Sequence, residues 1–236
     1  MYSFESRVRY SEVDAKRELS LTGIINYLQD CSTFQSEDLQ VGIQYLDQRR
    51  RAWLLSWWQI VVERCPVLGE RIVISTWPYD FKGMYGCRNF TICDGKGNYL
   101  VKANSLWFLF DTGAGRPVRI TEAEIQAYRP EIQEKLDMDY APRRIPLPLE
   151  YQSAGKLVVA RHHIDTNHHV NNAQYVELAR EVLPEVVQVR EVRVEYKKAA
   201  VLGDWIYPRI SRDADNCTVA LCNGEGNPYA VVWMRT

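Results

Sequence analysis

RHHIDTNHHVNNAQYVELAREVL, residues 161–183, is the most distinctive stretch of this sequence. It contains all four histidines of the protein, His162, His163, His168 and His169. Asp165 and Asn167 lie between the two histidine pairs, and Asn171 and Asn172 follow them. Imidazole, carboxylate and amide groups in such a short segment are typical of a site that moves a proton and holds a carbonyl oxygen.

The second half of this stretch predicts an amphipathic helix. Its apolar residues recur at helical spacing, at Val170, Tyr175, Val176, Ala179 and Leu183. Residues 156–161, just before the histidines, are predicted to form a strand. The sequence therefore predicts a strand, a polar loop and a helix in succession.

The same succession is predicted near the N-terminus. Residues 2–10 alternate between apolar and charged positions, which indicates a half-buried strand. Val13-Asp14 follows, as Ile164-Asp165 does in the later segment, and Ser20 is a residue type that caps helices. The helix that it introduces is apolar at Leu21, Ile24, Ile25 and Leu28.

Three pairs of similar landmarks indicate an internal duplication. Asp14 corresponds to Asp165 at an offset of 151 residues. The turns at Gly69 and Gly203 are offset by 134 residues, and the turns after Cys93 and Cys222 by 129. Because the order is preserved and the offset shrinks steadily, the second copy is predicted to be a shorter version of the first.

Each copy is predicted to contain one long helix and an antiparallel sheet. Strands are expected at residues 53–63, 71–77, 87–93 and 99–110 in the first copy and at 192–196 in the second. A helix this apolar has to be enclosed by its sheet. We therefore expect an α+β fold of the tandem hotdog type, with hotdogs at residues 1–128 and 151–236 joined by a proline-rich linker at 129–150.

The composition narrows the class of protein. The chain has 236 residues, a formal net charge of -1 and 46% hydrophobic residues, which argues for a packed core and against nucleic acid as the main partner. Charged residues interrupt every hydrophobic stretch, so no membrane span is expected. No signal peptide is visible and the six cysteines form no Cys-x-x-Cys pair, so we expect a cytoplasmic protein with reduced thiols.

The motif at residues 165–172 resembles that of the acyl-acyl-carrier-protein thioesterases. Asp-Thr-Asn-His-His-Val-Asn-Asn matches the family pattern Asp-x-Asn-x-His-Val-Asn-Asn, and residues 61–70, 104–107 and 195–198 resemble further family segments. The resemblance implies hydrolysis of the thioester between a fatty acyl chain and acyl carrier protein. It implies that the first hotdog binds the acyl chain, that the second carries the chemistry, and that no metal or organic cofactor takes part.

The resemblance and the chemistry together suggest Asp165, Asn167 and His169 as the catalytic set. An amide can donate to the carbonyl oxygen or orient water, and a histidine or a carboxylate can accept the proton of that water. The helix that begins near Asn171 adds free backbone amides at its positive end. In the alternative interpretation Asp165 and Asn171 only cap a turn and a helix. A metal site at the histidines is a third interpretation.

One departure from the family pattern limits the mechanism. Plant members carry Glu-Cys where this chain has Ala199-Ala200, after Lys197-Lys198. A cysteine nucleophile or a glutamate base at those positions is therefore excluded, which favours attack by water with Asp165 or His169 as the base. Glu177 in the helix is a fallback carboxylate, or a solvated helix residue.

Acyl carrier protein is acidic, so a basic docking surface is expected. Candidates are Arg49, Arg50, Arg51, Arg193, Lys197 and Lys198. Two alternatives remain for the function, an acyl-CoA thioesterase and a non-catalytic acyl-binding hotdog protein. A duplicated chain supplies its own pair of hotdogs, so either a monomer or a homodimer is compatible with the sequence.

Overall fold

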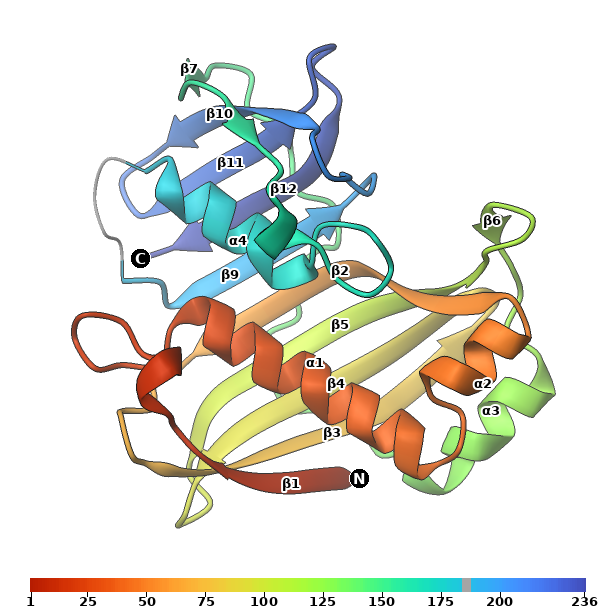
Figure 1. Cartoon of the computed structure of the whole chain (residues 1–236). Helices are drawn as coiled ribbons and strands as arrows, with labels where there is room; N and C mark the ends of the chain where they lie inside the picture. The colour runs from red at the N-terminus through yellow and green to blue at the C-terminus, as the bar shows by residue number, and fades with distance from the viewer. Residues whose placement is uncertain (184–187) are drawn as a thin grey trace. The chain divides into compact units, whose positions relative to one another are not determined.

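The computed structural model describes residues 1–183 and 188–236. They form two compact units (Figure 1). Unit 1 comprises Met1–Ser56 and Val62–Tyr140, and unit 2 comprises Trp57–Val61 and Ala141–Thr236. One strand, β2 (Arg51–Val62), thus gives residues 57–61 to unit 2 and the rest to unit 1.

Unit 1 consists of an antiparallel sheet, one long helix and shorter helices. The sheet has the order β1-β3-β4-β5, with bounds β1 (Tyr2–Arg7), β3 (Arg71–Lys82), β4 (Tyr85–Asp94) and β5 (Tyr99–Asp111), and β6 (Arg116–Pro117) pairs with β5. The helices are α1 (Leu21–Asp38), α2 (Ile43–Gln48), α3 (Glu122–Tyr128) and the 3-10 helices Tyr10–Glu12 and Arg129–Glu131.

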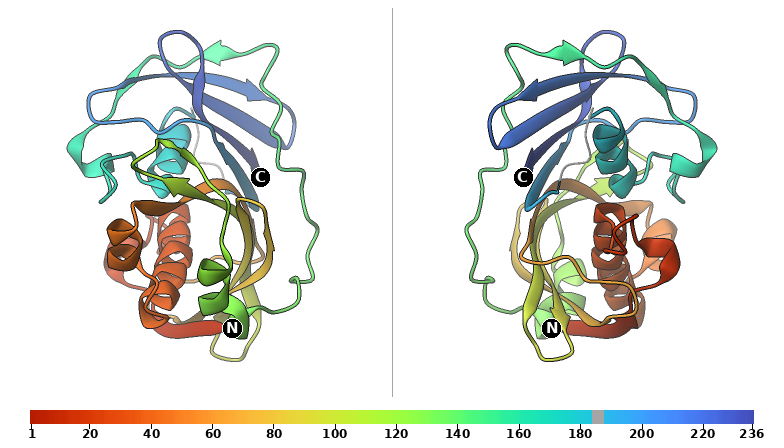
Figure 2. Two further views of the ribbon diagram at one scale, coloured as in Figure 1. Left: turned by 90° about the vertical axis from the view of Figure 1, so that its right-hand side faces the viewer. Right: turned by 90° about the vertical axis from the view of Figure 1, so that its left-hand side faces the viewer.

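Helix α1 packs along the concave side of this sheet (Figures 1 and 2). Ser20 caps it by accepting a hydrogen bond from the Gly23 N–H at 3.0 Å, as the sequence predicts. The predicted apolar face is buried, and Ile25 and Leu28 have no exposed surface. Burying a side chain of this size contributes about 1.5–3 kcal/mol, so α1 is held mainly by its contact with the sheet.

Unit 2 repeats this arrangement with fewer residues. Its sheet has the order β9-β12-β11-β10, with bounds β9 (Glu191–Tyr196), β12 (Pro228–Arg235), β11 (Asn216–Cys222) and β10 (Trp205–Arg212). Residues 57–61 of β2 pair with β9, while β7 (Gln152–Ser153) and β8 (Leu157–Val158) each pair with β10. Helix α4 (Asn172–Glu181) packs on β11 and β12, and a 3-10 helix spans Arg161–His163 (Figure 1).

Matching hydrogen bonds confirm the predicted duplication. In unit 1 the Gly69 N–H donates to the Val8 carbonyl at 2.9 Å, and in unit 2 the Gly203 N–H donates to the Val159 carbonyl at 3.0 Å. Each glycine has a positive φ, +81° in one turn and +87° in the other, a conformation that favours glycine. The two units are therefore copies of one fold, and the α+β tandem hotdog is confirmed.

The structure corrects the ends of three predicted strands. The strand expected at 2–10 ends at Arg7, and the strand expected at 156–161 is only Leu157–Val158. In each unit the strand ends one residue before a valine whose backbone bonds to a turn far away in the chain. Val8 bonds to Gly69 and Glu70, and Val159 bonds to Gly203 and Asp204. β3 continues to Lys82 rather than ending at residue 77, because Pro78 lies next to a bulge in the pairing with β4.

The proline-rich segment follows the outer side of each sheet by hydrogen bonds to side chains. In unit 1 the Leu136 N–H donates to Asn89 Oδ1 at 3.0 Å. In unit 2 the Ala141 N–H donates to Gln59 Oε1 at 2.9 Å, and the Ile145 N–H donates to Glu195 Oε2 at 3.1 Å. The side chain of Ile145 is buried against Ala220, Cys222 and Val231. The expected domain limits at 128/129 and 150/151 stay predictions.

A buried arginine lies between α1 and the sheet of unit 1. The Arg88 side chain, on β4, donates from Nη1 to Gln35 Oε1 on α1 and to Thr76 Oγ1 on β3, the latter at 3.1 Å. Gln35 has no exposed surface, and its Nε2 has no hydrogen-bond partner among the described residues. Burial lowers the pKa of Arg88 from its ordinary value. The guanidinium is therefore desolvated and held by neutral acceptors.

Candidate active site

The candidate site is the loop between the 3-10 helix Arg161–His163 and α4. Its two ends are joined by a bridge between Ile164 and Val170. Within it the Asp165 N–H donates to the His169 carbonyl at 2.9 Å, and the His168 N–H donates to the Asp165 carbonyl at 3.1 Å. His168 has a φ of +61°, so a non-glycine residue occupies the left-handed region at the tip of the loop.

Asp165 has a structural task in this loop. Its Oδ1 accepts the Asn167 N–H at 2.8 Å, which forms an Asx turn. Unit 1 has the same turn, in which Asp14 Oδ1 accepts the Lys16 N–H at 2.8 Å and Arg17 has a φ of +64°. The turn-capping interpretation of Asp165 is thus present in the structure, and it leaves the second carboxylate oxygen for other tasks.

Asn167 and His169 occupy positions at which the two loops differ in chemistry. By the offset of 151, Asn167 corresponds to Lys16 and His169 to Glu18. Asn167 is exposed and His169 is half-buried. Neither side chain is hydrogen bonded to another residue within 1–183 and 188–236, so the amide and the imidazole are open to an incoming molecule. No hydrogen bond joins them to each other or to the Asp165 carboxylate within those residues.

Helix α4 begins directly after this loop. Asn171 caps it, since its Oδ1 accepts the Ala173 N–H at 2.9 Å. The capping interpretation of Asn171 is therefore correct. The Gln174 N–H donates to the Asn171 carbonyl at 2.9 Å. The first turn contains no acidic residue, so no carboxylate there opposes a negative charge that develops near the positive end of the helix.

The backbone of Ala199-Ala200, the point of departure from the family pattern, is bonded to this loop. The Val170 N–H donates to the Ala200 carbonyl at 2.9 Å, and the Ala200 N–H donates to the Tyr175 hydroxyl at 2.8 Å. Burial raises the pKa of Tyr175 to about 12, so this phenol stays neutral. The fallback carboxylate, Glu177, lies 3.4 Å from Arg180 in an ion pair.

The other two histidines of the stretch lie before the loop. His163 is buried, and its Nδ1 accepts the Ala160 N–H at 3.0 Å. The rings of His162 and His163 meet edge to face, with 4.1 Å between their centroids. His163 had no predicted role, although its correspondence to Glu12 at the offset of 151 was visible in the sequence. Among the described residues, no three His, Cys, Asp or Glu side chains are grouped so as to hold a metal ion.

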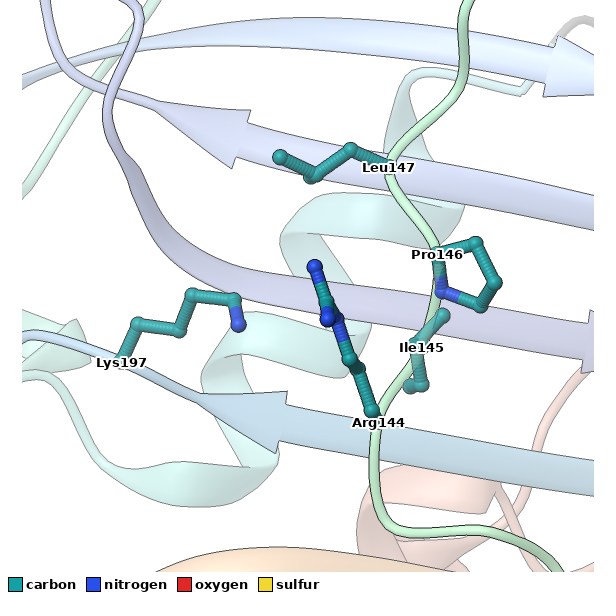
Figure 3. A pocket seen from close by; sticks show the side chains of 5 residues that line it. All are labelled: Arg144, Ile145, Pro146, Leu147 and Lys197. Carbon is teal, nitrogen blue, oxygen red and sulfur yellow. The ribbon is translucent and has the colours of Figure 1, made fainter.

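Three of the predicted docking residues make contacts with other side chains. Arg51 pairs with Asp111 at 2.8 Å, and the Arg193 guanidinium lies 3.9 Å from the centroid of the Trp233 ring. Lys197 pairs with Glu195 at 2.7 Å and also lines a pocket of about 490 Å³ on unit 2. Figure 3 shows the Lys197 and Arg144 side chains reaching into this space, beside the apolar side chains of Ile145, Pro146 and Leu147.

A further structural fact concerns membranes. In the part of the chain that the structure describes, no helix combines the length and the hydropathy required to span a bilayer.

Solved structures resemble the whole chain. An acyl-ACP thioesterase from Bacteroides thetaiotaomicron has a TM-score of 0.89 at 21% identity, over 99% of this chain and 96% of that one. A 12:0-ACP thioesterase from Umbellularia californica has a TM-score of 0.85 at 18% identity, over 99% and 96%. At these identities the two structures establish the tandem hotdog fold.

Sequence comparisons extend the likeness beyond the fold. An acyl-[acyl-carrier-protein] hydrolase of Cuphea viscosissima, described as chloroplastic, is 25% identical over 213 residues, which is 81% of this chain and 50% of the plant protein. The chain thus spans about half the length of the curated plant relatives it matches. Residues 1–128 match the family model of the acyl-ACP thioesterase N-terminal domain, and residues 148–231 match that of the C-terminal domain. The chain therefore belongs to the acyl-ACP thioesterase family.

Proposed function

We propose that this protein hydrolyses the thioester of fatty acyl-acyl carrier protein and releases the free fatty acid. The observation that carries the proposal is the difference between two loops of the same backbone structure. Unit 1 has Lys16 and Glu18 where unit 2 has Asn167 and His169, open and next to the N-terminus of α4. Family membership then identifies the thioester as the bond to be cleaved.

The catalytic set consists of Asp165, Asn167 and His169. The Asn167 amide donates to the carbonyl oxygen as negative charge develops on it, and the positive end of the α4 dipole stabilises the same charge. His169 or Asp165 accepts a proton as water attacks the carbonyl carbon. The carbon–sulfur bond then breaks, and the proton passes to the leaving thiolate. With alanine at 199 and 200, no cysteine or glutamate at those positions takes part.

The acyl chain and its carrier use the rest of the molecule. Unit 1 binds the acyl chain, because its helix and sheet supply the longer apolar interior. The acidic carrier protein docks through basic residues, of which Lys197 and Arg144 have an open pocket between them. No cofactor is needed for this chemistry.

The test is fatty acid release from a chain-length series of acyl carrier protein and acyl-CoA thioesters. The wild type is compared with Asn167→Ala and with the matched control Lys16→Ala in unit 1. We expect release to fall about 100-fold or more in Asn167→Ala, the typical loss of one oxyanion donor, and to be unchanged in Lys16→Ala.

Three other outcomes would change the proposal. Equal loss in both variants would mean that the loop acts only through stability. A preference for CoA substrates would favour the acyl-CoA thioesterase. Tight acyl binding without release from any thioester would favour a binding protein, and the Ala199-Ala200 departure is the observation that makes this second candidate worth testing.

A further inference from the structure

The two units use different side chains for one backbone contact. In unit 1 the Arg9 N–H donates to Glu12 Oε2 at 2.9 Å, which closes the 3-10 helix before the loop. At the same place in unit 2 the Ala160 N–H donates to His163 Nδ1 at 3.0 Å. The contacts around the two residues also agree, because the Ser20 N–H donates to the carbonyl of residue 12 at 2.9 Å and the Asn171 N–H to that of residue 163 at 2.8 Å.

This contact determines the protonation state of His163. A ring nitrogen that accepts a hydrogen bond carries no proton, so the imidazole is neutral with its proton on Nε2. A protonated imidazole has only donors, and its Nδ1–H would face the Ala160 N–H. A carboxylate, the group that Glu12 supplies in unit 1, accepts hydrogen bonds in its charged form. The second unit thus has an imidazole, which loses its acceptor when it gains a proton, where the first unit has a carboxylate.

Two hydrogen bonds of His163 hold the chain on either side of the candidate catalytic loop. The side chain of His163 binds the chain before the loop, at Ala160, and its carbonyl binds the chain after the loop, at Asn171. Asp165, Asn167 and His169 all lie between these two points. A change at His163 therefore reaches all three side chains through the backbone.

We propose that His163 is a positioning residue, whose neutral imidazole holds the Asp165–His169 loop and whose protonation releases it. This proposal deepens the proposed function and rests on it for its effect on catalysis. His163 does not touch the substrate in this scheme, and its effect is on turnover rather than on substrate binding.

The surroundings of His163 favour the neutral form. Burial lowers its pKa from the ordinary 6.5, and a charge on His162 lowers it further. The unfolded chain then binds a proton more readily than the folded chain, so the stability from this contact is complete above pH 6.5 and is lost as the pH falls below it. Other titratable groups lie in the segments bonded to this turn, namely Arg161, Asp165, His168, His169, Tyr175 and Asp204.

The first experiment measures kcat and KM between pH 5 and pH 8 for the wild type, His163→Glu and His163→Gln. Both substitutions keep an acceptor, and His163→Glu copies the solution of unit 1. We expect the wild type to lose more of its kcat between pH 7.5 and 5.5 than either variant, with KM unchanged. The extra loss should be at most about 10-fold, because protonation removes the neutral form by a factor of ten per pH unit below the pKa and the pKa of His163 lies below its ordinary value. His168→Asn, a change at an exposed histidine of the same loop, should keep the wild-type profile.

The second experiment needs no catalysis. Nitrogen-15 NMR of the wild type should show His163 as the Nε2–H tautomer at pH 7.5. Amide exchange slows on acidification in any chain, so the readout is the protection factor, which corrects for this. The protection factors of Ala160 and Asn171 should fall between pH 7.5 and pH 5.5 in the wild type, and this fall should be absent in His163→Glu. An Nδ1–H tautomer, or identical acid responses in the wild type and both variants, would overturn the proposal. If no thioester is hydrolysed, the NMR result still decides the role of His163, so the two failures are distinguishable.

Discussion

Asp165 combines two tasks that a single substitution can separate. Its Oδ1 closes the Asx turn, and its charge is available to the reaction. Asn closes the same turn but has no charge. We expect the free energy of unfolding of Asp165→Asn to lie within about 0.5 kcal/mol of that of the wild type. Its kcat should fall about 100-fold, the usual contribution of a general base. Asp165→Ala should lose the same activity and, in addition, about 1 kcal/mol of stability.

The matched control for this prediction is Asp14, which closes the corresponding turn of unit 1. Asp14→Asn should leave both stability and activity unchanged, as measured by urea unfolding and fatty acid release. If Asp165→Asn retained full activity, the carboxylate would be a capping group only, and His169 would be the base.

At the scale of elements, α1 and β4 are coupled through Arg88 and Gln35. Gln35→Leu removes an acceptor from a desolvated cation, and we expect it to lower the free energy of unfolding by about 2 kcal/mol. Arg88→Met removes the charge itself and fills the same space with an apolar chain, so its cost should stay below about 1 kcal/mol. In the Arg88→Met background Gln35→Leu should be nearly neutral, because it then removes only an unpaired amide.

Urea unfolding of the two single variants and the double variant measures this coupling. A coupling energy of about 1.5 kcal/mol or more is expected, since the two side chains are in direct contact. If the losses in free energy of unfolding of the two single variants add up to that of the double variant within about 0.5 kcal/mol, the contact contributes nothing to the packing of α1 on its sheet.

At the scale of the whole molecule, the carrier-protein proposal predicts a salt-dependent Michaelis constant. The double variant Arg144→Gln/Lys197→Gln should raise KM for acyl-acyl carrier protein about 10-fold at low salt, and much less at high salt, because exposed charges are screened. The kcat should not change. A short thioester of N-acetylcysteamine, which has no acidic carrier, is the control substrate and should be hydrolysed equally by both proteins. An unchanged KM for the carrier-protein substrate would place the docking surface elsewhere.

The sequence predicts the fold well because its landmarks are local. Asp14 and Asp165 each accept the backbone N–H of the residue two positions later, and the buried residues of α1 recur at helical spacing. The strand ends at Val8 and Val159 were not predictable in the same way. Their backbones bond to Glu70 and Asp204, which are distant in the chain, so no local pattern marks where the strand stops.

The candidate site could be predicted only in part, for a related reason. The motif of residues 165–172 identifies the loop, but it does not reveal that Asp165 and Asn171 serve the backbone as well. The hydrogen bond made by the His163 side chain could not be predicted, because unit 1 uses a carboxylate at the same position. Histidine and glutamate are different residue types, and only the structure shows that both accept the same backbone N–H.

The division of β2 between the units has a consequence for synthesis on the ribosome. Residues 57–61 pair with β9, whose residues emerge about 130 positions later. At ~5–20 residues per second this segment waits on the order of ten seconds for its partner. It reads Trp-Trp-Gln-Ile-Val, an apolar strand with an open edge, so the nascent chain carries an aggregation-prone segment until its C-terminal half arrives. A chaperone that shields nascent chains should therefore raise the soluble yield of the intact protein, and expressing residues 141–236 alone should leave β9 without this neighbour.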